Sequence, residues 1–311
     1  MDIKKIGLLG GRGYVGQEII ALLLHHNYLN ITSIFSSSKV GEPVKLGIDS
    51  TMLYQDLSLN NIVLGDEDAY ILALPNSQAK KYVDLIEHHN PKAIIVDLSA
   101  DHRFDDAWEY RVPELSEQVQ SNRISNPGCY ASAMQFMLAP LVNILKGSVN
   151  LFGVSGYSGA GASPNERNDL EALKDNILPY SLISHLHERE AKVHSYQDLL
   201  FTPHVGNFFR GIMMTGNFIL LEPMSSDEIY NLFAEYYDSK QLICIQQELP
   251  KLQDVQNTSN VIIGGFAVDQ EIKRLTFCCS LDNLLKGAAT QTVQNLNSAF
   301  GWEDNIGIIQ S

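Results

Sequence analysis

The sequence is poor in charged residues and has no basic run. Charged residues make up 19% of its 311 residues, and 22 Lys and Arg stand against 36 Asp and Glu, which gives a formal net charge of −14. This balance argues against nucleic acid and anionic membranes as partners. It does not exclude a small anionic substrate, because a local cationic site can exist within an acidic protein.

Long apolar segments are also lacking. No stretch approaches the ~20 apolar residues that a membrane-spanning helix needs. The first residues, MDIKKIGLLGG, contain a basic pair and a short apolar run, but the run breaks at a glycine cluster and lacks a small-residue cleavage site. We therefore expect a buried first strand there rather than a signal peptide.

Cysteine is scarce, and its spacing excludes the common metal motifs. The chain has four cysteines, which are Cys129, Cys244, Cys278 and Cys279. They form no CxxC pair and no Cys/His cluster with zinc spacing, so we predict no metal site and a protein of the reducing cytoplasm. The three other than Cys129 are expected to be small buried apolar residues.

Up to about residue 128, the chain alternates short apolar runs with helix-like segments. The expected strands are residues 5–10, 30–37, 69–75, 93–99 and 123–126. Between the first two, apolar residues recur at helical spacing. This order is typical of a parallel sheet covered by helices, so we predict an α/β domain of Rossmann type.

The pattern changes in the second half of the chain. Longer strands separated by turns predict a mixed, mostly antiparallel sheet, and SSDEIYNLFAEYYDS predicts a helix with Ser226 as its N-cap. A last amphipathic helix, 284–301, is expected to return to the first domain. The predicted domains are 1–128 together with about 286–311, and an α+β domain over 129–285.

A glycine-rich turn follows the first expected strand. In GLLGGRGYVGQEII, two overlapping registers occur, G-x-x-G-x-x-G from Gly10 and G-x-G-x-x-G from Gly11. Between a strand and a helix, such glycines let the backbone approach a pyrophosphate, whose charge the helix N-terminus stabilises. Any tight turn favours glycine, but this context favours a dinucleotide site. The predicted cofactor contacts are Gly10, Gly11, Arg12, Gly13, Tyr14, Val15 and Gly16.

The end of the second expected strand indicates which dinucleotide binds. An NAD site usually has an acidic residue there for the ribose 2′-hydroxyl. This chain instead has Ser36, Ser37, Ser38 and Lys39, and no acid before Glu42. Hydroxyls and an ammonium suit a 2′-phosphate, so we predict NADP (NADPH), the alternative being a polar loop without this role.

Cys129 lies between a turn and a helix, in RISNPGCYASAMQF. A thiol at a helix N-terminus has a lowered pKa, because the dipole and the local amide groups stabilise the thiolate. A helix-start cysteine is more often structural than catalytic. Together with a dinucleotide site, however, it suggests covalent catalysis on an acyl group.

Nine histidines offer a general acid or base, and spacing does not select one. SHLHERE contains His185 and His187, and TPHVGNFFRGI contains His204. Only the fold can bring one of them close to Cys129. A metal site at His185, His187 and Glu190 is an alternative, but nothing else in the sequence supplies ligands for it.

Taken together, the motifs resemble the N-acetyl-γ-glutamyl-phosphate reductases and, more distantly, the aspartate-semialdehyde dehydrogenases. The stretches that carry the resemblance are GLLGGRGYVGQE, VDLSADHRF, VPEL, SNPGCYASA, SGYSGAGAS, HLHERE, FTPHVGNFFRGI and DNLLKGAATQTVQN. They occur in family order across nearly the whole chain. No single motif is specific, whereas the set is.

The resemblance implies a Rossmann-type NADP domain interrupted by an α+β catalytic and dimerisation domain, in a homodimer or homotetramer. It implies that Cys129 is the nucleophile and His185 the acid/base. The implied substrate contacts are Arg103, Asn126, Glu190, His204 and Arg210. Cofactor contacts are expected at Leu74, Pro75 and Ser99, and around the nicotinamide at Ser158, Gly159, Gly161 and Asn283.

The implied reaction is the NADPH-dependent reduction of N-acetyl-γ-glutamyl phosphate to the semialdehyde and phosphate, through a thioester, in arginine biosynthesis. The chain departs from the family where HLHERE replaces HRHxPE, and where GYSGAGAS lacks the basic pair of GVSGAGRK. Arg103 lies among aspartates, so a structural ion pair is an alternative role for it. Other hypotheses are the same chemistry on aspartyl or aminoadipyl phosphate, and a non-catalytic NADP-binding regulator.

Overall fold

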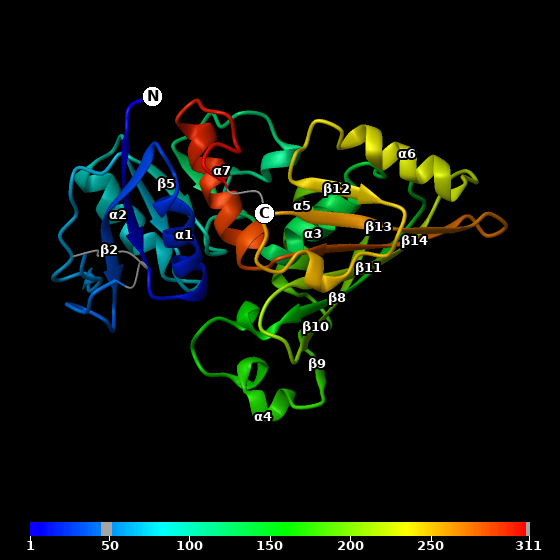
Figure 1. Ribbon diagram of the computed structural model, residues 1–311, viewed down its shortest axis with the longest axis horizontal. Coiled ribbons are helices and arrows are strands. Elements are labelled where there is room, and N and C mark those ends of the chain that lie inside the picture. The colour runs from blue at the N-terminus through cyan, green and yellow to red at the C-terminus, as the bar shows by residue number, and fades with distance from the viewer. Residues whose placement is uncertain (45–51, 309–311) are drawn as a thin grey trace. The chain divides into compact units, whose positions relative to one another are not determined.

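The computed structural model describes residues 1–44 and 52–308, and these form two compact units (Figure 1). The first unit comprises Met1–Pro127 and the chain from Ala288 to Ile308, and the second comprises Gly128–Gly287. The divisions predicted from the sequence lie near residues 128 and 286. No helix of the described residues is both long and apolar enough to cross a membrane.

The first unit is built on a seven-stranded parallel sheet, which confirms the predicted α/β architecture. The strand order is β3-β2-β1-β4-β5-β7-β6. The strands are β1 (Lys4–Leu9), β2 (Leu29–Ser36), β3 (Gln55–Asp56), β4 (Ala69–Leu72), β5 (Ile94–Asp97), β6 (Glu109–Tyr110) and β7 (Arg123–Ser125). Leu8 and Leu9 point to opposite faces of β1 and are both fully buried, so the sheet is covered on both faces.

Helices α1 (Tyr14–Leu24) and α2 (Ala79–His89) belong to the crossovers of this sheet, and a short 3₁₀ helix η1 covers Pro113–Leu115. Strand β1 lies between β2 and β4, so the strand order reverses at β1. In open α/β sheets, ligands bind outside the carboxyl ends of the strands at such a reversal. The fold therefore places the glycine turn after β1 where a dinucleotide is expected.

The C-terminal helix α7 (Thr290–Ala299) lies against α1 and β5 of the first unit (Figure 1). It is polar yet almost completely buried. Two of its buried amides bind the surrounding chain: Gln294 donates to Glu114 (2.8 Å), and Asn295 donates to Asn126 (3.0 Å) and accepts from Arg111 (3.0 Å). Buried amides need such partners, so these hydrogen bonds hold α7 in one position.

The second unit is built on a mixed seven-stranded sheet, ordered β12-β13-β14-β11-β8-β10-β9. Four of its strand pairs are antiparallel and two are parallel, as predicted. The strands are β8 (Val149–Gly156), β9 (Ile177–Pro179), β10 (Leu199–Gly206), β11 (Ile212–Ile219), β12 (Ile243–Gln246), β13 (Val261–Asp269) and β14 (Arg274–Leu281).

Four α-helices and four 3₁₀- or π-helical turns complete the described part of this unit. The α-helices are α3 (Cys129–Leu138), α4 (Leu170–Leu173), α5 (Leu186–His194) and α6 (Ser226–Tyr236), and the turns are η2 (Tyr157–Ala160), η3 (Glu166–Asn168), η4 (Leu252–Asp254) and the π-helical η5 (Leu285–Ala289). Helix α3 packs on β11 and β14, α5 on β10, and α6 on β12 and β13.

Two local predictions for this unit are wrong. The N-cap of α6 is Ser225, not Ser226, because the Ser225 side chain forms a capping box with Glu228. Of the three cysteines expected to be buried, only Cys279 is; Cys278 is half-buried and Cys244 is exposed. Adjacent strand residues point to opposite faces, so Cys278 and Cys279 cannot both face the core.

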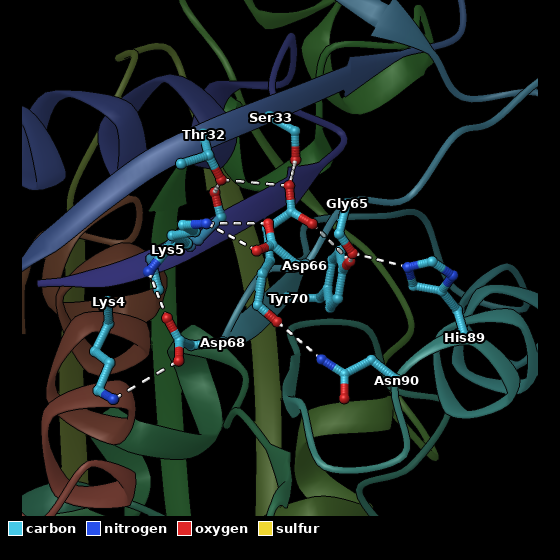
Figure 2. Close-up of polar contacts among 12 residues, drawn as sticks. Lys4, Lys5, Thr32, Ser33, Gly65, Asp66, Asp68, Tyr70, His89 and Asn90 are labelled. Carbon is cyan, nitrogen blue, oxygen red and sulfur yellow. Dashed lines mark hydrogen bonds and ion pairs between the residues drawn. The ribbon is translucent and has the colours of Figure 1, made fainter.

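A buried carboxylate ties the amino-terminal part of β4 to β2. Glu67 is 4% exposed and accepts hydrogen bonds from Ser33 Oγ (2.6 Å) and the Tyr70 hydroxyl (2.7 Å). Burial, and then the neighbouring carboxylate, raise the pKa of Tyr70 far above its ordinary value, so Tyr70 remains a donor. Figure 2 shows the surroundings of this cluster, including the exposed ion pair between Lys5 and Asp66 (2.9 Å).

We expect Glu67→Ala to lower the free energy of unfolding of the first unit by about 3 kcal/mol, because two buried hydroxyl donors lose their acceptor. Tyr70→Phe should cost about 1 kcal/mol. Urea unfolding measures both. Asp66→Asn is the control, since it removes a neighbouring but exposed ion pair and should barely move the midpoint. An equal effect of Glu67→Ala and Asp66→Asn would contradict the role given to the buried carboxylate.

Candidate active site

The turn between β1 and α1 depends on its glycines. Gly10 has a φ of +90°, and a Cβ on Gly16 would lie 2.6 Å from the Gly10 carbonyl oxygen. Gly13 is the N-cap of α1 and offers no capping side chain. The first turn of this helix contains no acidic residue. The helix therefore presents a positive end to an anion such as a pyrophosphate. Leu74 lies against the turn, with Pro75 directly after it.

The end of β2 lies beside this turn, because the amides of Gly10 and Gly11 donate to the carbonyl oxygen of Phe35 (3.0 and 3.1 Å). The hydroxyl of Ser36 is buried and accepts from the backbone of the loop that follows, including Lys39 N (3.3 Å). Ser37 and Ser38 are exposed.

The ammonium of Lys39 pairs with Glu42 at 2.7 Å, and both side chains are largely exposed. A ribose 2′-phosphate at this loop would therefore compete with Glu42 for Lys39. The exposed pair that it would replace contributes little free energy. The hydroxyls of Ser37 and Ser38 and this cation fit a 2′-phosphate, so the residues present are compatible with NADP.

The loop after β5 is organised by the buried carboxylate of Asp97. It accepts a hydrogen bond from Ser99 Oγ (2.8 Å), so the hydroxyl of this predicted cofactor contact turns toward the protein. Arg103 is also buried and donates to the carbonyl oxygens of Leu98 (2.8 Å) and Asn126 (3.1 Å). Two predicted substrate contacts, Arg103 and Asn126, thus lie together in the first unit.

In the second unit, Cys129 is the first residue of α3 and is half-buried. Its N-cap is Gly128, and the first turn contains no acidic residue. The amide groups and the dipole at this position favour an anionic sulfur. A Cβ on Gly287 would lie 2.6 Å from the Cβ of Cys129, so the chain at η5 can approach the nucleophile this closely only as glycine.

Glu190 fixes the backbone next to the thiol. Its carboxylate, on α5, is fully buried and accepts a hydrogen bond from the Gly128 amide at 2.8 Å. This buried hydrogen bond joins α5 to the start of α3. Glu190 was expected from the family resemblance to contact substrate, and the structure gives it this contact with the backbone.

The thiol lines a pocket that is formed within the second unit. The lining residues are Cys129, Tyr130, Ser155, Gly156, Gly159, Ala160, Arg167, Tyr180, His187 and Val205. The guanidinium of Arg167 lies over the ring of Tyr180, 4.8 Å from its centroid. Burial, and then the nearby Cys129, raise the pKa of Tyr180 to about 12, so its phenol is neutral.

Two histidines stand next to each other at this pocket. His187 lines it, and the His185 ring is centred 5.1 Å from that of His187 and 5.4 Å from that of Tyr180. His185 is also the N-cap of α5, because its Nδ1 accepts from His187 N (3.1 Å). Burial, and then the charge of Arg167, lower the pKa of His185 from 6.5 to about 4, so its imidazole is neutral at neutral pH.

The turn after β8 is tied to the segment after β14. Asn283 Nδ2 donates to Ser158 Oγ at 2.9 Å, and a Cβ on Gly159 would lie 2.9 Å from Ser155 Oγ. Gly161 has a φ of +81°, which turns the chain after η2. Because Ser155 and Gly159 line the pocket, the residues expected around the nicotinamide form one connected corner beside it.

Two other predicted substrate contacts lie elsewhere in the second unit. Arg210 forms a two-point ion pair with the buried Asp282, at 2.5 and 3.1 Å. The His204 ring lies against Phe152, with ring centroids 4.5 Å apart. His204 therefore faces away from Val205, the next residue of β10, which lines the pocket.

Sequence reasoning missed Arg167 and Tyr180, which belong to none of the recognised motifs. Arg167 is the first basic residue after SGYSGAGAS, and this was the available clue. Only the fold places it beside the thiol. Among the described residues, no group of three or more His, Cys, Asp or Glu side chains is arranged to hold a metal ion.

Family models match both units. One described as "Semialdehyde dehydrogenase, NAD binding domain" matches residues 5–122, and one described as "Semialdehyde dehydrogenase, dimerisation domain" matches residues 129–283. The chain is 42% identical, over 97% of its length and 98% of the relative's, to the N-acetyl-gamma-glutamyl-phosphate reductase of Xanthomonas campestris pv. campestris strain 8004. It is also 42% identical to Protein arg11, mitochondrial, of Schizosaccharomyces pombe, of which it spans only 35%.

Solved structures agree on the fold. Aspartate semialdehyde dehydrogenase II from Vibrio cholerae superposes with a TM-score of 0.80 at 16% identity, covering 97% of this chain and 99% of that one. An aspartate semialdehyde dehydrogenase with NADP from Candida albicans gives 0.71 at 18% identity, covering 93% and 96%. With family models over both units and reductases as full-length relatives, this chain belongs to the semialdehyde dehydrogenase family, among the N-acetyl-γ-glutamyl-phosphate reductases.

Proposed function

We propose that this chain reduces N-acetyl-γ-glutamyl phosphate to N-acetylglutamate 5-semialdehyde and phosphate, with NADPH, in arginine biosynthesis. The observation that carries the proposal is a cysteine at a helix N-terminus, in a pocket with an arginine and a histidine. It occurs in a chain 42% identical to reductases of this name over nearly its full length. NADPH supplies the hydride, and the glycine turn and residues 36–39 of the first unit would hold it.

The Cys129 sulfur is the proposed nucleophile. It attacks the acyl carbon of the acyl phosphate, so that an S–C bond forms and the C–O bond to phosphate breaks, with the electron pair leaving on phosphate. The product is a thioester. Glu190 supports this step as a positioning residue, because its hydrogen bond to Gly128 fixes the first turn of α3.

A neighbouring histidine handles the proton. When hydride adds to the thioester carbonyl, the resulting oxyanion takes a proton, which is returned as the C–S bond breaks and the aldehyde forms. We assign this role to His185 on the family resemblance. His187 is the second candidate, because it is the histidine that lines the pocket.

We also propose a homodimer that forms through one face of the second sheet, the face opposite the helices that pack on it. Helices α3, α5 and α6 pack on this sheet. Phe152 on β8 and Leu200 on the adjacent β10 point outward and are 42% and 50% exposed. An exposed apolar sheet face is typical of an association surface, and the matching family model is named for dimerisation.

A cytoplasmic location is proposed on the four cysteines, none of which forms a disulfide.

Cys129→Ser should abolish phosphate-dependent oxidation of N-acetylglutamate semialdehyde by NADP, by a factor of at least about 10⁴, because the thioester cannot form. Cys244→Ser, which changes an exposed cysteine, is the matched control and should retain full activity. NADPH binding, measured by fluorescence, should be unchanged in both. Substantial turnover by Cys129→Ser would disprove the covalent route.

His185→Asn should reduce kcat by about 10²- to 10⁴-fold while NADPH still binds, since one proton-transfer group is lost. Asparagine is a good N-cap, so the substitution preserves the start of α5. His187→Asn is the comparison. If it removes turnover and His185→Asn does not, the proton transfer belongs to His187.

The pH dependence of stability offers a control for the same variant. The pKa of His185 is about 4 in the folded chain and 6.5 in the unfolded one, so the unfolded state binds the proton first as the pH falls. Neutral His185 therefore contributes up to about 3 kcal/mol to the free energy of unfolding. This contribution is fully present above pH ~6.5 and is lost as the pH falls toward ~4. Between pH 7.5 and 4.5, the wild type should therefore lose more stability than His185→Asn.

Leu200→Glu should convert the dimer into a species near the monomer mass of 34.6 kDa, because a charge is introduced into the proposed interface. Light scattering after size exclusion measures this mass. Val193→Glu on α5 is the control, since Val193 is even more exposed but lies on a helix. Dimers that persist in Leu200→Glu would place the interface elsewhere.

A further inference from the structure

Arg167 is a cation of the second unit that lies in the same pocket as the nucleophile. It is half-buried and lines the pocket together with Cys129. Its guanidinium lies over the Tyr180 ring at 4.8 Å, and no carboxylate of the described residues forms an ion pair with it. Arg210 differs, because Asp282 binds it at two points.

The support under Arg167 is suited to holding the guanidinium in place without cancelling its charge. A ring face attracts a guanidinium and restricts its plane, while the N–H donors at the edge remain available. Asn165 caps the short helix η3 through the Arg167 amide (3.0 Å), which fixes the backbone that carries this side chain.

Arg167 is the permanently charged side chain among the residues that line the pocket, and no Asp or Glu is among them. The acidic side chains that give the chain its net charge of −14 all lie outside this lining. A planar guanidinium donates to two oxygens of a phosphate or carboxylate at once in a fixed fork, whereas a lysine ammonium acts as a point charge.

We propose that Arg167 binds the phosphate group of the acyl phosphate, and inorganic phosphate in the reverse reaction. This rests on the proposed function. The phosphate is bonded to the carbon that Cys129 attacks, so it must occupy the same pocket as the sulfur, and Arg167 is the arginine that lines this pocket. Paired with Arg167, the phosphate leaves as a stabilised anion.

The first test needs no turnover. Alkylation of Cys129 is measured by peptide mass spectrometry with iodoacetate, an anion, and iodoacetamide, its neutral counterpart. Arg167→Gln should lower the ratio of the two rates about tenfold, because one charge-assisted contact is lost. Arg189→Gln removes a charge on α5 from an exposed residue outside the pocket lining and should leave the ratio unchanged. Equal ratios in all three proteins would overturn the proposal.

The second test identifies the ligand group. In the oxidative direction phosphate is a separate substrate, and Arg167→Gln should raise its KM at least about tenfold while the KM of the semialdehyde changes little. A rise confined to the KM of the semialdehyde would show that Arg167 binds the substrate carboxylate and would overturn the assignment. If the wild type itself does not turn over this semialdehyde, the proposed function fails, and the alkylation ratio still decides the role of Arg167.

Discussion

The chemistry of this protein depends on how narrowly the start of α3 is constrained. Cys129 is fixed from two directions, by the close approach of Gly287 to its Cβ and by the hydrogen bond from the Gly128 amide to the buried Glu190. Neither contact involves the sulfur. Together they leave the thiol at a helix end that favours the anion, facing a pocket instead of the core. A nucleophile on a less constrained turn would lose this orientation.

The cationic side chains described above differ in the groups that they contact. Arg210 is neutralised by Asp282, Arg103 donates to two backbone carbonyl oxygens, and Lys39 shares an exposed pair with Glu42. Arg167 contacts an aromatic ring instead. An acidic protein can therefore bind an anionic substrate, because the potential that the substrate meets is set by the few groups lining the pocket and not by the net charge.

Polar side chains also hold secondary-structure elements together, a role that apolar side chains usually have. The Glu67 cluster joins β4 to β2, and the amides of α7 hold that helix within the first unit through bonds such as Gln294 to Glu114. Hydrogen bonds are directional, so these contacts define register and position where apolar packing would tolerate several.

The sequence by itself determined the family, the parallel and mixed sheets, the glycine turn and the cysteine at the start of a helix. These follow from local patterns, since strand periodicity, turn glycines and helix starts are set by neighbours in the chain. It could not rank His185, His187 and His204, because their distances from Cys129 depend on how α5 and β10 pack. It also left Arg167 and Tyr180 unnoticed. Only the tertiary structure placed Arg167, Tyr180 and His187, and not His204, around the thiol, because η3, α5, α3 and the residue after β9 converge on one pocket through contacts that no sequence spacing encodes.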